Sequence, residues 1–198
     1  MRLESDVTLI CVDTLDCARD KAALVKCLDK VPFKNVRFIG PCNELNASMP
    51  LSAYSDFCIR HLHEYFETSH CLIVQHDGWI CNGSKWQDSF LDFDFVGCIA
   101  NWSEPSMTGK GGCGGFSLRS RRLMELASRI AVNTHPEDVV LSRAKPHGQR
   151  EDFEAAGMVF APNSVQRLWG FDNDRYTGEF GHHRARDFGP YPERCAQV

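Results

Sequence analysis

Short apolar runs that alternate with amphipathic segments constrain the fold of this chain more than any other feature of its sequence. Val7 to Val12 (VTLICV) and Cys71 to Gln75 (CLIVQ) read as buried strands, and Val36 to Ile39 as a shorter one. Between them, residues 16–30 and Ser55 to Phe66 carry apolar side chains at helical spacing, with the serine as the expected N-cap. This order predicts an α/β fold with a mostly parallel central sheet flanked by helices.

The second half of the chain carries weaker signals of the same kind. Glycine, proline and serine at 103–115 predict a loop, and the chain from about residue 170 onward is polar, aromatic and irregular in pattern. The other predicted elements are short helices at 85–91, 137–143 and 150–156, a helix at 120–130, and strands at 94–99 and 158–161. Neither an internal repeat nor a linker divides the sequence, so we expect residues 1–198 to form a single domain.

Composition excludes several classes of protein. The chain has 198 residues, of which 43% are hydrophobic, which is enough for a sizeable core. No apolar run approaches the roughly 20 residues of a membrane-spanning helix. The first residues lack a signal-peptide pattern, so a cytoplasmic location is expected. None of the ten cysteines forms a CxxC pair, which favours reduced, buried thiols over disulfides or a structural zinc site.

The charge distribution bears on possible partners. The net charge is −4, and acidic residues prevail up to residue 108 whereas basic residues prevail after it. A protein that binds nucleic acid mainly through phosphate neutralisation is usually more basic. Arg119, Arg121, Arg122 and Arg129 are clustered, so they form either a local anion site or the solvated face of a helix.

Polar residues follow the predicted strands where a ligand would bind. In parallel α/β sheets, ligands bind beyond the carboxyl ends of the strands, which is where Asp13 and Asp77 fall. Asp77 is followed by Gly78, which has no side chain to block a ligand. A carboxylate at this place either binds a hard cation such as Mg²⁺ or Mn²⁺, or caps a turn.

Three further segments are candidates for chemistry. Residues 109–123 contain five glycines within seven positions, so their backbone can approach a ligand closely, although they match neither a Walker loop nor GxGxxG. In residues 134–143, Thr134 is a candidate cap for a helix, and the adjacent acids that follow offer a general base. His182 and His183 are adjacent, so at most one of them would point at a given site.

These segments, taken in order, resemble a family of small glycosyltransferase-like proteins long catalogued as a domain of unknown function. QHDG at 75–78, GGFSLRS at 114–120 and HPED at 135–138 match its QxDG, GNGGFSLRS and HPED motifs, and FGHH at 180–183 matches FGFH except that His182 stands where an aromatic residue is usual. The resemblance covers about residues 6–184 and extends more distantly to the GT-A glycosyltransferases, including β-galactosyltransferases. It implies a GT-A-like single domain.

The resemblance also implies a donor site for a nucleotide sugar, with a UDP-sugar as the expected donor. Its implied residues are Asp13, Thr14, Arg60, His76, Asp77, Gly78, Gly114, Gly115, Phe116 and Ser117. Of these, Asp13 and Thr14 would contact the uridine or ribose, and Arg60 the diphosphate. The segment from Gly114 to Ser117 would line the donor sugar and the acceptor.

Metal binding and catalysis are implied in the same way. Asp77 and His183 would bind Mn²⁺ or Mg²⁺, although Gln75 stands where such enzymes usually have the first acid of a DxD motif. Glu137 or Asp138 would deprotonate an acceptor hydroxyl in an inverting displacement. The acceptor is a glycan, a small molecule or a hydroxymethylated base in phage-type DNA. One alternative is a non-catalytic nucleotide-sugar-binding or carbohydrate-binding module of the same fold, and another is a metal sensor with cysteine and histidine ligands.

Overall fold

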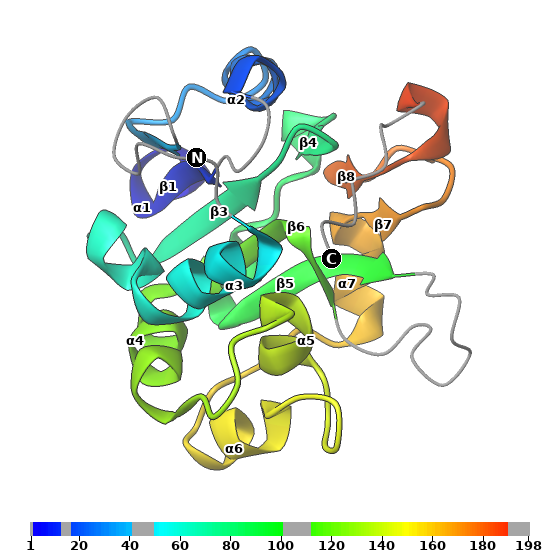
Figure 1. The fold of residues 1–198 in the computed structure, drawn as a ribbon. Coiled ribbons are helices and arrows are strands. Elements are labelled where there is room, and N and C mark those ends of the chain that lie inside the picture. The colour runs from blue at the N-terminus through cyan, green and yellow to red at the C-terminus, as the bar shows by residue number, and fades with distance from the viewer. Residues whose placement is uncertain (1, 13–16, 41–49, 101–111, 190–198) are drawn as a thin grey trace.

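A single eight-stranded sheet runs through the residues that the computed structural model describes, which are 2–12, 17–40, 50–100 and 112–189 (Figure 1). The strands follow the spatial order β2-β1-β3-β6-β5-β7-β8-β4. Their bounds are β1 Val7–Val12, β2 Asn35–Ile39, β3 His70–Val74, β4 Gly78–Ile80, β5 Phe95–Ala100, β6 Gly112–Ser120, β7 Phe171–Asp172 and β8 Gly181–His183.

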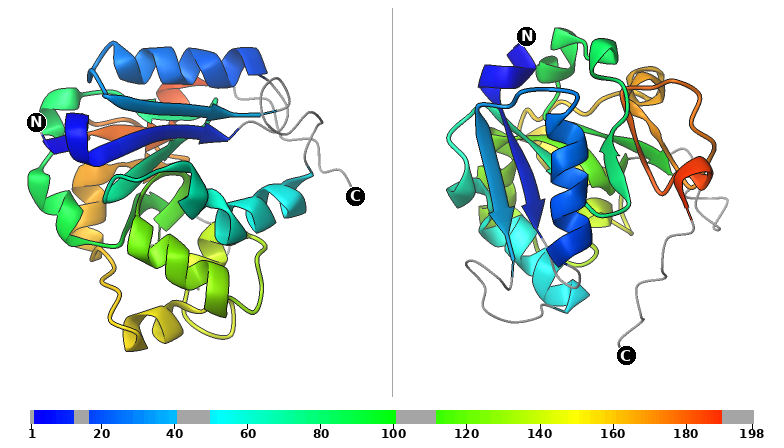
Figure 2. Two further views of the ribbon diagram at one scale, coloured as in Figure 1. Left: turned by 90° about the vertical axis from the view of Figure 1, so that its left-hand side faces the viewer. Right: turned by 90° about the horizontal axis from the view of Figure 1, so that it is seen from above.

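The first three long strands confirm the pattern seen in the sequence. β1 is parallel to both β2 and β3, and Leu9 lies between Val36 and Leu72. Every residue of β1 and β3 is buried, as their continuous apolar composition requires. The helix between β1 and β2 and the one before β3 lie on opposite faces of the sheet (Figure 2).

The sheet is mixed, so the prediction of a mostly parallel sheet was wrong. β6 is antiparallel to both β3 and β5, and β4 is antiparallel to β8. Antiparallel neighbours need no helical crossover, and after β3 the chain turns straight back through a bridge between Gln75 and Gly78. Parallel pairs join β1 to β2 and β3 in the first half of the chain, and β7 to β5 and β8 in the second.

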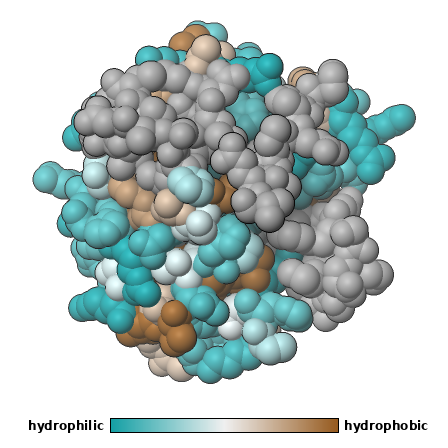
Figure 3. Space-filling view, viewed as in Figure 1, coloured by the Kyte–Doolittle hydropathy of each residue, from teal (hydrophilic) through white to brown (hydrophobic). Residues whose placement is uncertain are grey.

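Helices cover both faces of the sheet. Their bounds are α1 Arg2–Asp6, α2 Cys17–Leu28, α3 Leu51–Arg60, α4 Arg121–Ile130, α5 Glu137–Ser142, α6 Arg150–Ala155 and α7 Asn163–Trp169. One core lies between the sheet and α2 and α7, and includes Leu24 and Trp169. The other lies beneath α3 to α6, with Tyr54, Met124 and Phe153 among its side chains. On this second face, hydrophobic residues are exposed only in small patches between hydrophilic ones (Figure 3).

Several predicted boundaries move. α3 begins at Leu51, so Ser55 is a buried residue inside the helix rather than its cap. No side chain caps α5, so Thr134 does not have its predicted role, whereas Ser120 caps α4 through its hydroxyl. Residues 112–115 belong to β6 instead of a loop. Residues 83–92 form two short 3-10 turns, and 158–161 contribute only a bridge from Phe160 to Phe95.

The cysteines and the helices agree with the remaining expectations from composition. Among the described residues, seven cysteines have free thiols and all but Cys81 are buried. Burial raises the pKa of the Cys27 and Cys71 thiols to about 12, which keeps them protonated and unreactive. In the described ranges, no helix combines the length and the apolar character that a membrane span requires.

The segment after residue 170, predicted to be irregular, instead extends the sheet with β7 and β8. It is held there by an aromatic cluster around Trp169, which is fully buried against Phe116 and Phe180. The indole N–H of Trp169 donates to the Phe116 carbonyl at 3.0 Å. Aromatic residues spaced irregularly along the chain thus meet in space, which a search for periodic patterns does not detect.

Truncation of Trp169 tests whether this cluster holds the last two strands. We expect Trp169→Ala to lower the free energy of unfolding by about 3–5 kcal/mol, because it empties a packed core site. Leu168→Ala is the matched control, since its side chain in the same helix is 47% exposed and should cost below about 1 kcal/mol. Denaturant unfolding of both variants measures the difference, and equal losses would contradict the assignment.

Candidate functional site

A cavity of about 330 Å³ opens where β3, β6, β8 and the first turn of α5 meet. The residues that carry its chemistry are Gln75, Asp77, Gly115, Glu137, Asp138 and His183. They come from all four motifs singled out in the sequence, which the sheet order brings side by side. The two adjacent acids predicted to supply the general base therefore share one cavity with the predicted metal ligands.

The wall formed by α5 is held by a buried ion pair. Arg119 on β6 is fully buried, and its Nη2 donates to Oε1 of Glu137 at 3.1 Å. Although burial disfavours the charged guanidinium, Glu137 outweighs it and raises the pKa of Arg119. Ser55 also donates to Glu137 Oε2, at 3.4 Å, and lies 2.9 Å from the ring of His135. Glu137 is thus committed to contacts within the protein.

Asp138 has a different environment. It is half-buried at the cavity, and its Oδ2 accepts from the Gly114 N–H at 3.1 Å while Oδ1 accepts from the Val139 N–H. Burial, with the Glu137 charge beside it, raises the pKa of Asp138 to about 6. A carboxylate with that pKa is a suitable general base near neutral pH.

His183 forms the other side of the site together with Asp77. Its Nε2 lies 3.2 Å from Asp77 Oδ1, and its Nδ1 lies 2.7 Å from Asp172 Oδ1 and 3.0 Å from Cys113 Sγ. Burial opposes protonation of the imidazole, but the three neighbours outweigh it and raise the pKa of His183 well above its usual value. This concentration of acceptors attracts a cation, whether a proton or a metal ion.

The pair of Asp77 and His183 fits a divalent metal. Two ligands at right angles and about 2.1 Å from an ion are about 3 Å apart, close to the separation of these two atoms. His183 Nε2 is buried and makes no hydrogen bond to any described residue. Carboxylate oxygen and imidazole nitrogen are also ligand types that Mn²⁺ accepts.

Two glycines of β6 allow both walls to approach the same strand. A β-carbon at Gly114 would lie 2.5 Å from Oε1 of Glu137, and one at Gly115 would lie 2.2 Å from His183 Nε2. Both distances are well inside van der Waals contact. A side chain at Gly114 would displace Glu137 or Asp138, and one at Gly115 would fill the space beside His183, the candidate metal ligand. The glycines thus matter as close-packed strand residues, not as a flexible loop.

Other predicted donor residues lie beside the cavity or away from it. His76 lies 3.7 Å from Asp77 Oδ2, and Gly78 begins β4 next to the main chain of Gly115. Phe116 is buried in the core against Trp169, and the Ser117 hydroxyl donates to the Gly114 carbonyl. Phe116 and Ser117 therefore do not line the cavity but contribute to the packing of its wall. Asp13 and Thr14 lie outside the described residues.

The structure does not bring Arg60 to the cavity. Its guanidinium donates to the carbonyl oxygens of Ser128 at 2.8 Å and Ala131 at 2.7 Å, at the end of α4. A different cation, Arg184, lines the cavity, with its Nε 3.9 Å from Asp77 Oδ2. Arg184 has a left-handed backbone (φ 51°), and its N–H donates to the Asp77 carbonyl at 2.6 Å.

The clustered arginines do not form a shared anion site. Arg119 is buried on Glu137, Arg122 pairs with the buried Asp94 at 2.5 Å, and Arg121 pairs with Glu125 at 2.8 Å. Of the four, Arg129 alone forms no ion pair with a residue in the described ranges, and it is exposed. The adjacent histidines diverge as expected, because His182 packs edge-on against Trp79 rather than facing the cavity.

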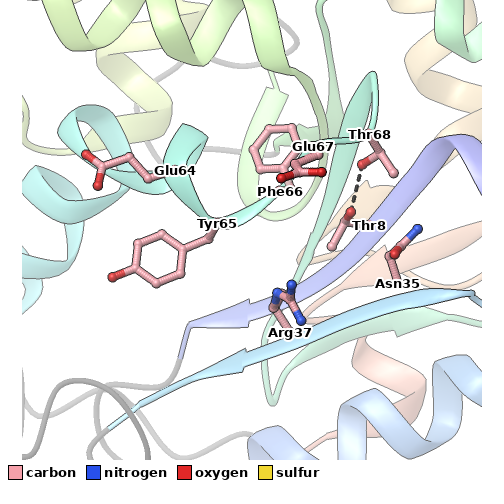
Figure 4. A pocket seen from close by; sticks show the side chains of 8 residues that line it. All are labelled: Thr8, Asn35, Arg37, Glu64, Tyr65, Phe66, Glu67 and Thr68. Carbon is pink, nitrogen blue, oxygen red and sulfur yellow. Dashed lines mark hydrogen bonds between the residues drawn. The ribbon is translucent and has the colours of Figure 1, made fainter.

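A larger cavity of about 540 Å³ lies at the amino ends of β1 and β2, between Thr8, Asn35, Arg37 and the segment 64–68 (Figure 4). The Thr8 and Thr68 hydroxyls share a hydrogen bond there. Its charged side chains are one arginine and two glutamates, and the cavity contains none of the motif residues. Size alone therefore does not identify the site, and the smaller cavity is the candidate because it gathers the reactive groups.

Comparisons with known proteins place the chain in a family. Residues 45–174 match the family described as "Protein of unknown function (DUF5672)". The chain belongs to this family. No curated protein matches the sequence. Among solved structures, the chain is similar to A197 from STIV, with 14% identity and a TM-score of 0.42 over 67% of this chain and 74% of that one.

Sequence reasoning missed Asp172, Cys113 and Arg119 as parts of the site. Asp172 stands in a segment predicted to be irregular, and Cys113 in a predicted loop. Arg119 and Ser117 alternate with the apolar Phe116 and Leu118, a pattern typical of a strand with one solvent-exposed face, so nothing in the sequence indicated that Arg119 is buried. In the structure that face is covered, and the buried charge needs a partner.

Substitution of Arg60 separates its structural role from donor binding. We expect Arg60→Ala to lower stability by about 1–3 kcal/mol, because it removes two charge-assisted hydrogen bonds at the end of α4. Binding of a UDP-sugar, measured by calorimetry below the melting temperature, should be unchanged. A loss of donor affinity with unaltered stability would instead support contact between Arg60 and the diphosphate.

Proposed function

We propose that this protein is a metal-dependent glycosyltransferase that moves a sugar from a nucleotide sugar, expected to be a UDP-sugar, to an acceptor hydroxyl. One observation carries the proposal: a single cavity holds a carboxylate with a pKa of about 6 and, across the Gly114–Gly115 backbone, a carboxylate–imidazole pair that fits a divalent ion. Sugar transfer from a diphosphate requires a base and a cation at one place.

Asp138 is the base in this proposal, and Glu137 supports it. Glu137 is held by Arg119 and Ser55, so its oxygens are already engaged. Asp138 lines the cavity, and the negative charge of Glu137 helps to raise its pKa. Two adjacent carboxylates thus take different roles, because Glu137 is hydrogen-bonded to the Arg119 guanidinium whereas Asp138 accepts from main-chain N–H groups.

The reaction is a single displacement at the anomeric carbon. The acceptor oxygen forms the new bond to that carbon as its proton passes to the Asp138 carboxylate. The bond from the anomeric carbon to the diphosphate oxygen breaks, and its electron pair leaves with the diphosphate. A displacement of this kind inverts the anomeric configuration. It has no covalent intermediate on the protein.

The leaving diphosphate needs positive charge. Mn²⁺ or Mg²⁺ held by Asp77 and His183 would supply Lewis-acid stabilisation of the diphosphate. Arg184 lies beside Asp77 and supplies a fixed cation from the protein. In this proposal Arg184 therefore has the role, contact with the diphosphate, that the family resemblance implied for Arg60.

The acceptor in this proposal is a glycan or a small molecule. The arginines that would suit a DNA base as acceptor are largely paired within the protein, which weighs against the nucleic-acid alternative. A binding module without catalysis is the second candidate, and one observation favours it. Gln75 replaces the first acid of the usual metal motif, and its amide donates to the Tyr54 hydroxyl at 2.8 Å.

Replacing the base tests the proposed chemistry. We expect Asp138→Asn to lower kcat/KM for transfer by about 10²–10⁴-fold, because the amide cannot accept the proton. In the wild-type protein, kcat/KM should rise with pH up to about 6 and then level off, because Asp138 acts only when deprotonated. Asp152→Asn removes an exposed carboxylate paired with Lys145 and serves as control. Full transfer by Asp138→Asn would refute the assignment.

Removing the metal ligand tests donor binding and separates enzyme from binding module. A thermal-shift panel of UDP, GDP, TDP and CDP sugars should show Mn²⁺-dependent stabilisation by a UDP-sugar, and Asp77→Asn should abolish the part that depends on Mn²⁺. UDP-sugar hydrolysis with and without Mn²⁺ is then measured on the wild-type protein. Tight binding without any hydrolysis or transfer would favour the module.

A further inference from the structure

The two ring nitrogens of His183 face two different carboxylates. Nε2 lies 3.2 Å from Asp77, which lines the cavity, whereas Nδ1 lies 2.7 Å from Asp172, which does not line it. All three side chains are buried. The imidazole therefore has one nitrogen turned to the cavity and one turned to the protein interior.

We propose that Asp172 is a positioning residue that fixes the orientation and tautomer of His183. With Nδ1–H donating to Asp172, the lone pair of neutral imidazole is on Nε2, beside Asp77. Ligating histidines commonly donate their second N–H to a carboxylate, which fixes the ring and makes the other nitrogen a better ligand. This inference rests on the proposed function, since it takes Asp77 and His183 as the metal ligands.

The main chain sets this arrangement. Asp172 on β7 pairs in register with His183 on the parallel strand β8. The Asn173 N–H donates to the His183 carbonyl at 3.2 Å, and the Asn173 amide donates to Oδ2 of Asp172 at 3.1 Å. Asp172 thus has one oxygen held by Asn173 and the other directed at the imidazole. Such double support is what a rigid second layer around a ligand requires.

Cys113 lies on the same nitrogen, with its Sγ 3.0 Å from His183 Nδ1. The Asp172 carboxylate oxygen is closer to this nitrogen, at 2.7 Å. A neutral thiol is a weak acceptor, whereas a carboxylate is a strong one. Asp172 is therefore the stronger acceptor for the Nδ1 proton of His183. A different role for the three residues is direct ligation of a thiophilic ion by Cys113, Asp172 and His183, whose ligand atoms all lie within 4.8 Å of one another.

The test is the affinity for Mn²⁺ alone, measured from the electron paramagnetic resonance signal of the free ion. We expect Asp172→Ala to weaken Mn²⁺ binding about 10- to 100-fold. Asp172→Asn, which keeps an acceptor oxygen but loses the charge, should show a smaller loss. Asp174→Asn is the matched control, because it removes the same charge two residues away, where the carboxylate accepts from the Arg175 N–H. It should bind Mn²⁺ as the wild type does.

Circular dichroism at the assay temperature establishes that each variant is folded, and the isosteric Asp172→Asn keeps the test decisive if Asp172→Ala does not fold. Wild-type affinity in Asp172→Asn, or in folded Asp172→Ala, would overturn the positioning role. If Asp77→Asn nevertheless loses Mn²⁺, the proposed function stands without it. If the wild-type protein binds neither Mn²⁺ nor Mg²⁺, both proposals fail.

Cys113→Ala separates positioning from direct ligation. We expect this variant to keep wild-type affinity for Mn²⁺, because Asp172 remains on Nδ1. The same measurements are made with Cd²⁺, a thiophilic probe. If wild-type protein binds Cd²⁺ but not Mn²⁺, and both Cys113→Ala and Asp172→Ala abolish Cd²⁺ binding, the three residues are themselves the ligands and the positioning role is wrong.

Discussion

The ion pair between Arg119 and Glu137 is the contact on which the candidate site depends. A guanidinium without solvent access needs a charged partner, and leaving it alone would cost about 3–5 kcal/mol. Arg119 also donates to the Ser117 hydroxyl at 3.0 Å and to the Gly114 carbonyl at 3.3 Å. One side chain therefore ties the start of α5 to the glycine-rich end of β6. Because Asp138 follows Glu137 directly, the position of the proposed base depends on this ion pair.

The same strand also limits where the metal-facing wall can lie. Gly114 lies against Glu137 and Asp138, and Gly115 lies against His183. Two adjacent residues without side chains thus let an acidic helix start and a histidine from the last strand meet across a single backbone. The energetic cost of glycine in a strand is offset by burial, since every residue of β6 is buried. The geometry of the candidate site is a consequence of sheet packing.

The sequence was a good guide wherever chemistry and periodicity are local. The runs VTLICV and CLIVQ could be placed because continuous burial on both faces demands continuous apolar sequence. The motif residues Asp77, Glu137, Asp138 and His183 could be found because their types and order follow a family pattern, and the structure places all four around one cavity. These signals do not predict whether strands joined without a helical crossover run parallel or antiparallel to their neighbours.

Long-range partners were the other part that the sequence could not supply. Asp172 reaches His183 only because β7 and β8 pair in parallel, and each of these strands is too short to have a detectable pattern. Arg60 shows the opposite error, a contact that the sequence implied and the structure does not have. A basic residue in a matching motif suggested a phosphate contact, but its guanidinium donates to two carbonyl oxygens at a helix end, away from the cavity. Side-chain type gives the possible chemistry, and only packing decides which partner satisfies it.

The charge of the cavity connects these contacts to the proposed reaction. Arg119 and Glu137 form an ion pair, which leaves the carboxylates of Asp77 and Asp172 beside His183 and that of Asp138 on the α5 wall of the cavity. A nucleoside diphosphate is itself an anion, so this cavity would repel it in the absence of added positive charge. Arg184 offsets one of the carboxylates. Under the proposed function, Asp77 and His183 would hold a divalent cation, and its positive charge would make the acidic wall attractive to the diphosphate. Under the proposed function, metal and donor binding are thus coupled, and each should raise the affinity for the other.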